Sequence, residues 1–160
     1  MGIDFGEINY IAVVVAVIIN MIGGAAWYGI LAKPWMGEVG LTKESIDERP
    51  HSEMIRGYIV AIIASIVIAM ALAILIQAAG AKDIDGLTIG VVAGLGFVAT
   101  VLGSVSAFEG RSLKLYLINA GYPVIMFAII GALLGIGSRT NMPATSMGRV
   151  AGISLLLDAA

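Results

Sequence analysis

The sequence predicts an all-α fold, an integral membrane bundle of four transmembrane helices. Hydrophobic residues make up 59% of the 160 positions and charged residues only 12%, about half of the roughly 25% typical of soluble domains. The apolar residues fall into four runs of about 23 to 25 residues, and about 20 residues are enough for a helix to cross a bilayer. Because lipid offers no hydrogen bonds to the backbone, each run must be helical.

The four helices are expected at residues 8–32, 57–81, 86–108 and 115–137. With their linkers they form a four-helix transmembrane domain, residues 1–137, that uses nearly the whole chain. The first run is too long for a signal peptide, and acidic residues precede it, so we expect it to stay in the mature protein. Residues 138–160 are predicted to be an extramembrane or interfacial tail, because their apolar run is too short to cross.

The first linker, residues 33–56, is the only long one. Thr42 is a favourable N-cap for a short helix in this linker. Pro50 should end that helix, since the residue before a proline avoids the helical conformation. Residues 82–85 and 109–114 are expected to be tight turns.

Basic residues predict the orientation of the chain. Four crossings put the first and third linkers on one face, and the termini with the second linker on the other. The first and third linkers carry Lys33, Lys43, Arg49, Arg56, Arg111 and Lys114. The other face carries Lys82, Arg139 and Arg149. By the positive-inside rule we expect linkers 33–56 and 109–114 to be cytoplasmic and both termini to lie outside the cell membrane.

Aromatic residues gather near the helix ends on the predicted cytoplasmic side. They are Trp27, Tyr28, Trp35, Tyr58, Phe108 and Tyr116. Amphipathic rings favour the headgroup layer, but rings packed against one another between helix ends would give the same pattern. The sequence leaves both interpretations open.

Small residues are spaced for close helix packing. The predicted packing positions are Gly23, Gly24, Gly90, Gly94, Gly131 and Gly135. In lipid, helices associate through close packing, and small residues four apart let their backbones approach. These faces fit packing within one chain or a seam between copies.

Two amides and a proline lie inside the predicted crossings. Asn20 and Asn119 are expected to seek hydrogen-bond partners on other helices. Pro123 removes a backbone donor and clashes with the carbonyl of Asn119, which predicts a kink in the last helix. Structural cross-linking and the lining of a ligand path are both open roles for the amides.

The sequence contains little catalytic chemistry. There is no cysteine and one histidine, His51, so no metal or cofactor site is expected. No ionisable residue lies near the middle of a predicted crossing, which argues against ion-coupled transport. The net charge of −2 and the lack of a basic run give no reason to expect a nucleic-acid partner. No catalytic residue is predicted, although Glu109, Arg111 and His51 would be the polar groups of any enzyme here.

Charged residues near the ends of the helices are candidates for contact with a lipid headgroup or a partner. Glu109, Arg111 and Lys114 lie around the third linker, and Lys33 follows the first helix. The alternative is a solvated loop whose charges partly pair with one another.

Two stretches carry a family resemblance, GGAAWYGILAKPWMGEVGL at 23–41 and GFVATVLGSVSAFEGRSLKLYLINAGYPVIMFAIIGAL at 96–133. Through them the chain resembles the small membrane proteins catalogued as domain of unknown function 1761. The resemblance implies the same four-helix topology and no established activity. It also marks residues for testing, namely Trp27, Tyr28, Trp35, Glu109, Arg111 and Asn119.

The leading functional hypothesis is a non-enzymatic accessory or structural subunit. Such a bundle would pack against other membrane subunits or against lipids. The alternative is a homo-oligomeric channel or carrier for a small solute, because four helices are few for a transporter monomer. The expected partners are therefore the lipid bilayer and either other membrane subunits or further copies of this chain.

Overall fold

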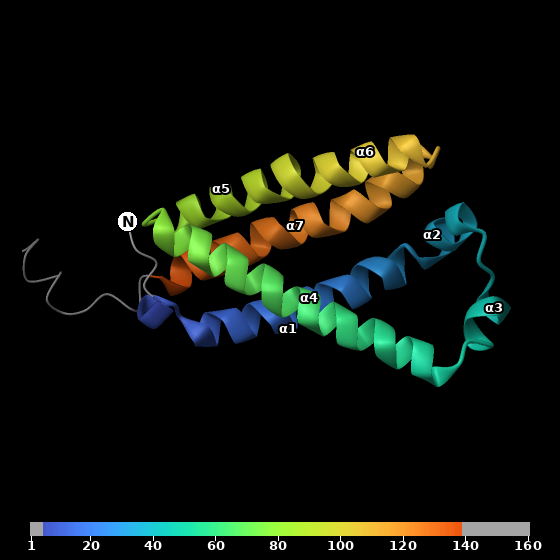
Figure 1. The fold of residues 1–160 in the computed structure, drawn as a ribbon, viewed down its shortest axis with the longest axis horizontal. Coiled ribbons are helices and arrows are strands. Elements are labelled where there is room, and N and C mark those ends of the chain that lie inside the picture. Colours follow the sequence, from blue (N-terminus) through green and yellow to red (C-terminus); the bar gives the residue numbers. More distant parts are fainter. Residues whose placement is uncertain (1–4, 139–160) are drawn as a thin grey trace, which may run out of the picture.

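A computed structural model describes residues 5–138, and within that range the protein is a bundle of helices without strands (Figure 1). Four spans are long and apolar enough to cross a membrane. They are α1 (Tyr10–Ile30), α4 (His51–Ala78), α5 (Ile84–Ala93) continued through η2 (Gly94–Ala99) into α6 (Thr100–Phe108), and α7 (Leu113–Gly137). The predicted all-α membrane bundle is confirmed. Residues 139–160 of the predicted tail lie outside the described part.

α4 begins at His51, before the predicted start at residue 57. Pro50 stands at its N-cap, with φ of −57°, a value close to the helical one. The apolar run identifies only the part of a helix that lipid surrounds, so the polar turn from His51 to Arg56 extends the helix beyond that run.

The first linker contains two short helices, α2 (Ala32–Val39) and α3 (Lys43–Asp47). Thr42 caps α3 as predicted: its Oγ1 accepts from the Ser45 amide at 3.2 Å, and the Ser45 hydroxyl accepts from the Thr42 amide at 3.0 Å. This reciprocal pair satisfies two backbone donors that a helix start leaves free. α2 was not expected, and its last turn is followed by Gly40 in the left-handed conformation, with φ of 70°.

The two ends of the bundle have different connections. α2, α3 and the turn between α6 and α7 lie at one end (Figure 1). At the other end, the Asn9 amide donates to the Gly137 carbonyl at 3.1 Å, and the Ser138 hydroxyl donates to the Ala81 carbonyl at 3.1 Å. The first and third linkers therefore share one end, and the described part of the N-terminus shares the other with the second linker.

α5 and α7 pack with their backbones in contact. A Cβ added to Gly90 would lie 2.8 Å from the carbonyl carbon of Phe127, and one added to Gly131 would lie 3.0 Å from the Cα of Gly90. Gly135 faces Gly86, which the sequence analysis did not select although it precedes Gly90 by one helical repeat. These glycines form a seam within one chain, which leaves no space for a second helix there.

Gly94 lies where the third span changes its winding. A Cβ added there would lie 3.0 Å from the Cα of Val124 on α7. Gly94 is the first of the six residues of the π-helical turn η2, a widened turn that was not predicted. The hydroxyl of Tyr116, on α7, donates to the Ala99 carbonyl at 3.2 Å. α7 itself continues through Pro123, and the predicted kink there stays a prediction.

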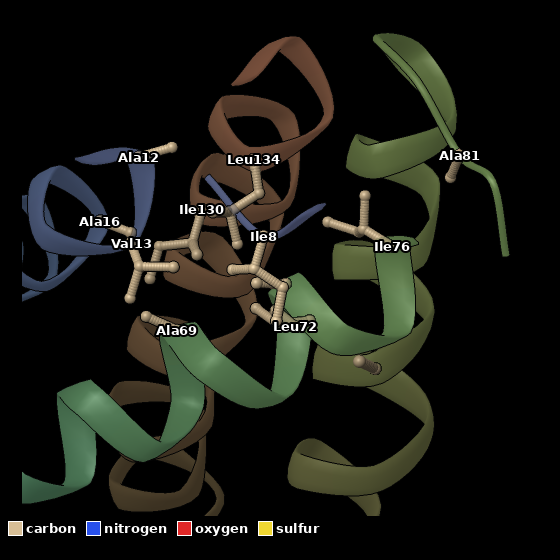
Figure 2. Close-up of a cluster of buried hydrophobic side chains, with 12 residues drawn as sticks. Ile8, Ala12, Val13, Ala16, Ala69, Leu72, Ile76, Ala81, Ile130 and Leu134 are labelled. Atoms are coloured by element: carbon tan, nitrogen blue, oxygen red, sulfur yellow. The ribbon is translucent and has the colours of Figure 1, made fainter. Parts of the chain in front are cut away.

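The hydrophobic core lies at the end of the bundle that holds the start of α1 and the end of α7 (Figure 2). Leu72 and Ile76 of α4 meet Ile130 of α7 there, and each is less than 2% exposed. Towards the other end α1 and α4 diverge (Figure 1). Every residue of α4 from 51 to 64 is exposed, so the bundle is closed at one end and open at the other.

Candidate functional site

Asn20 connects three helices in the interior of the bundle. Its side chain is buried on α1, and its Nδ2 donates to the Ser65 hydroxyl of α4 at 2.7 Å. Its Oδ1 and its backbone carbonyl each lie 3.0 Å from the hydroxyl of Tyr122 on α7, which donates to them. The Ser65 hydroxyl donates in turn to the Ala61 carbonyl at 2.8 Å. This amide is therefore a cross-link, as is typical of polar groups in membrane bundles.

Ser65 and Tyr122 were not among the predicted site residues. Ser65 is the only serine or threonine in the second apolar run. A single hydroxyl in such a run could have indicated a hydrogen bond to another helix. Tyr122 lies inside the second stretch of the family resemblance, residues 96–133, but nothing in that stretch singled it out. Its role depends on a residue 102 positions away, which no local pattern shows.

Asn119 is the centre of an aromatic cluster at the open end. Its Oδ1 accepts from the indole nitrogen of Trp35 at 3.2 Å and from the Tyr28 hydroxyl at 3.5 Å. The ring of Tyr28 lies 6.0 Å from that of Trp35 and 5.7 Å from that of Tyr122. The cluster thus joins α1, α2 and α7, and Tyr122 connects it to Asn20.

Trp27 connects α1 to α7 through a hydrogen bond and through packing of its ring. Its indole nitrogen donates to the Ile118 carbonyl at 2.9 Å. The six-membered edge of the indole lies over Gly121, where an added Cβ would be 3.1 Å from the ring. Gly23 and Gly24 make room for side chains of α7 rather than for its backbone, because an added Cβ would clash with Met126 or Tyr122.

The aromatic residues divide between the two interpretations that the sequence left open. Trp27, Tyr28 and Trp35 pack between helices through the contacts above. Tyr58 and Phe108 instead are 65% and 93% exposed, as residues facing the headgroup layer would be.

Two cavities meet at Tyr28, which lines both. The inner cavity, about 560 Å³, lies between α1, α4 and α7 and includes Asn20, Tyr58, Ser65 and Tyr122 in its lining. The mouth cavity, about 460 Å³, is bounded by α2, α6 and α7 and is lined in part by Trp35, Glu109, Arg111 and Asn119. Only uncharged residues line the inner cavity, whereas the mouth cavity has an ion pair on its wall.

The charged residues that were predicted as a group do not share one site. Arg111 pairs with Glu109 at 2.9 Å beside the mouth cavity. Lys114 pairs with Glu38 of α2 at 3.2 Å and lines a separate apolar groove. Lys33 is exposed on α2. Arg111 and Lys114 are thus paired and still exposed, and their contact with a headgroup or a partner stays a prediction.

Glu38 holds α2 against the start of α7. It accepts a hydrogen bond from the Ser112 hydroxyl as well as pairing with Lys114. The hydrogen bond from Ser112, followed by the contact with Lys114, lowers the pKa of Glu38 from its ordinary value of 4.5. Neither Glu38 nor Ser112 was a predicted site residue.

Acidification should release α2. Because the folded-state pKa of Glu38 is lowered, its contribution to stability is fully present above pH 4.5 and is lost as the pH falls through the lowered value. Fluorescence of Trp35, in a Trp27→Phe background, should report this release as a transition below pH 4.5. Ser112→Ala should move the transition to higher pH. An unchanged midpoint in that variant would contradict the role given to Glu38.

Within residues 5–138 no group of three or more His, Cys, Asp or Glu side chains is placed to hold a metal ion. His51, at the exposed start of α4, does not line the mouth cavity with Glu109 and Arg111. The three polar groups considered for an enzyme are therefore not all brought to that cavity.

Comparison with known proteins identifies one family. The family described as Protein of unknown function (DUF1761) matches residues 11–135. No curated protein matches the chain. No solved structure matches it either. The matched range includes the Asn20 cross-link, the aromatic cluster and both cavities.

Proposed function

Because the chain belongs to the family described as Protein of unknown function (DUF1761), which names no activity, we propose its function from its geometry. The protein is a non-enzymatic accessory subunit that assembles with other membrane proteins through the first half of α4. The observation that carries this proposal is the continuous exposure of residues 51–64, in a helix whose second half packs into the core.

The contact surface follows from the helical repeat. Ile55, Ile59, Ile63 and Ile66 form one stripe and are between 46% and 56% exposed. At 100° per residue this stripe lies roughly 150° around α4 from the residues that line the inner cavity. β-Branched side chains have few rotamers to lose on packing. Since the glycine seam is used inside the chain, this stripe is the surface we assign to a partner helix.

Single cysteines test the proposal, because the chain has none of its own. In native membranes, Ile59→Cys carrying a photoreactive maleimide should cross-link to a protein partner. Val101→Cys on α6, which is 61% exposed in the wild type, is the matched control and should not. Purification in mild detergent and mass spectrometry would identify the adduct. Adducts with lipid alone at position 59 would contradict the proposal.

A second candidate is a homo-oligomeric channel or carrier for a small solute. The position of Tyr28 on the walls of both the inner and the mouth cavity favours it, since one side-chain movement would join them. The absence of charged residues from the inner cavity suits an uncharged solute. Cross-linking of position 59 only to another copy of the chain would favour this candidate over the accessory subunit.

The proposal includes an orientation in the cell membrane. α2, α3 and the turn before α7 are placed on the cytoplasmic side, and both termini on the outside. The basic residues of the first and third linkers support this assignment. The partner would then meet α4 in the cytoplasmic half of the membrane.

A further inference from the structure

The inner cavity has hydrogen-bond donors to spare and few free acceptors. Asn20 Oδ1 lies within reach of the Tyr122 hydroxyl, and the Ser65 hydroxyl both accepts from Asn20 and donates to Ala61. An amide nitrogen carries two hydrogens, and only one of those on Asn20 has a partner in the described residues.

Two tyrosines add to this donor capacity. The Tyr58 hydroxyl has no hydrogen-bond partner among residues 5–138. The Tyr28 hydroxyl reaches only Asn119, at 3.5 Å, beyond the usual range for a hydroxyl donor. Both hydroxyls lie on the wall of the cavity and can donate, so this wall suits a ligand that brings acceptors.

The rest of the lining is apolar and uncharged. Met21, Ala25, Ala61 and Ile68 complete most of the wall, and neither a cation nor an anion faces the space. A volume of about 560 Å³ falls in the range of roughly 300 to 1,000 Å³ that holds small organic ligands. Tyr58, Ala61 and Ala64 of this wall lie in the exposed stretch of α4, so a ligand would enter from the lipid.

We propose that the inner cavity binds an uncharged amphiphile whose head carries carbonyl oxygens and whose body is a hydrocarbon chain. Tyr58 and Tyr28 donate to the carbonyls, and the chain lies along Ala61 and Ile68. Quinones with alkyl tails and esters of glycerol share this chemistry. The inference goes beyond the proposed function, since the isoleucine stripe on α4 takes no part in it.

The full chain in lipid nanodiscs, titrated with 2-decyl-1,4-benzoquinone, tests the site through quenching of tryptophan fluorescence. Trp35 is close enough to report, because its ring lies 6.0 Å from that of Tyr28. Ala61→Phe fills the cavity and should weaken binding at least about 10-fold. Tyr58→Phe removes one donor and should weaken binding about 3- to 10-fold. Ala71→Phe, at an exposed position elsewhere on α4, is the matched control and should bind as the wild type does.

Competition then separates the head group from the tail. Decane has the hydrocarbon chain without carbonyl oxygens and should not displace the quinone. Recovery of the quenched fluorescence on adding decane would overturn the claim for carbonyl recognition. Unchanged binding by Ala61→Phe, with a circular dichroism spectrum like that of the wild type, would overturn the site itself. Dioctanoylglycerol identifies the source: displacement of the quinone assigns the site to ester lipids, and no displacement assigns it to quinones.

Discussion

Gly90→Ala is expected to separate α5 from α7 and to destabilise the bundle. The added Cβ would clash with the Phe127 carbonyl group, because it would lie 2.8 Å from the carbonyl carbon and closer still to the oxygen. A backbone atom cannot rotate away as a side chain can, so the two helices must move apart. Overpacking costs about 1 to 3 kcal/mol, and a clash against backbone should reach the upper end.

Unfolding in detergent by titration with dodecyl sulfate, followed by circular dichroism, measures this effect. Gly96→Ala is the control, because it adds the same methyl group to the same span where nothing lies within 4 Å. Equal midpoints for the two variants would contradict the α5–α7 seam. If Gly90→Ala kept its midpoint but lost a protein partner, the glycines would belong to an intermolecular seam instead.

Trp27→Ala is expected to give the second large loss of stability, about 3 kcal/mol. Large-to-alanine changes of tryptophan cost about 3 to 5 kcal/mol when the ring is buried, and Trp27 is only partly buried. The variant loses the packing over Gly121 and the hydrogen bond to the Ile118 carbonyl. α1 would then be held to α7 by Tyr122 and Met126 and by the packing at the closed end, where the Asn9 amide donates to the Gly137 carbonyl.

Trp27→Phe separates the two contributions. It keeps an aromatic ring and loses the donor, so it should cost only about 1 kcal/mol. Trp35→Ala removes the tryptophan of α2, a short linker helix rather than a membrane span, and should cost less than Trp27→Ala. Thermal unfolding in detergent measures all three variants. A larger loss for Trp35→Ala than for Trp27→Ala would contradict the role given to Trp27.

Local features of the chain were predictable because their causes are local. The four apolar runs require helices wherever lipid is the solvent, and the even number of crossings places the linkers in pairs. Thr42 and its capping partner Ser45 lie three residues apart, so the start of α3 could also be predicted from the sequence. The start of α4 was missed because a polar first turn follows Pro50, and an apolar run does not show how far its helix extends.

The functional contacts depended on tertiary structure. Asn20 was identifiable as an amide in lipid, yet its partners, Ser65 and Tyr122, lie 45 and 102 positions away. Glu38 and Lys114 were both visible as charges, but not as a pair. The inner cavity exists because α1 and α4 diverge towards the open end, and the mouth cavity exists because α2 folds back beside α6 and α7.

These contacts could not be predicted because the helices are surrounded by lipid rather than by water. In a soluble protein an amphipathic pattern shows which face of a helix points inward. Here α4 and α7 are apolar on all sides, because apolar side chains are as stable facing lipid as they are facing another helix. The sequence by itself therefore determined that these segments are membrane helices. It also determined which linkers lie together at each end of the bundle. Only the tertiary structure decided which faces meet, because close contact at glycines and single hydrogen bonds, rather than burial of apolar surface, select them.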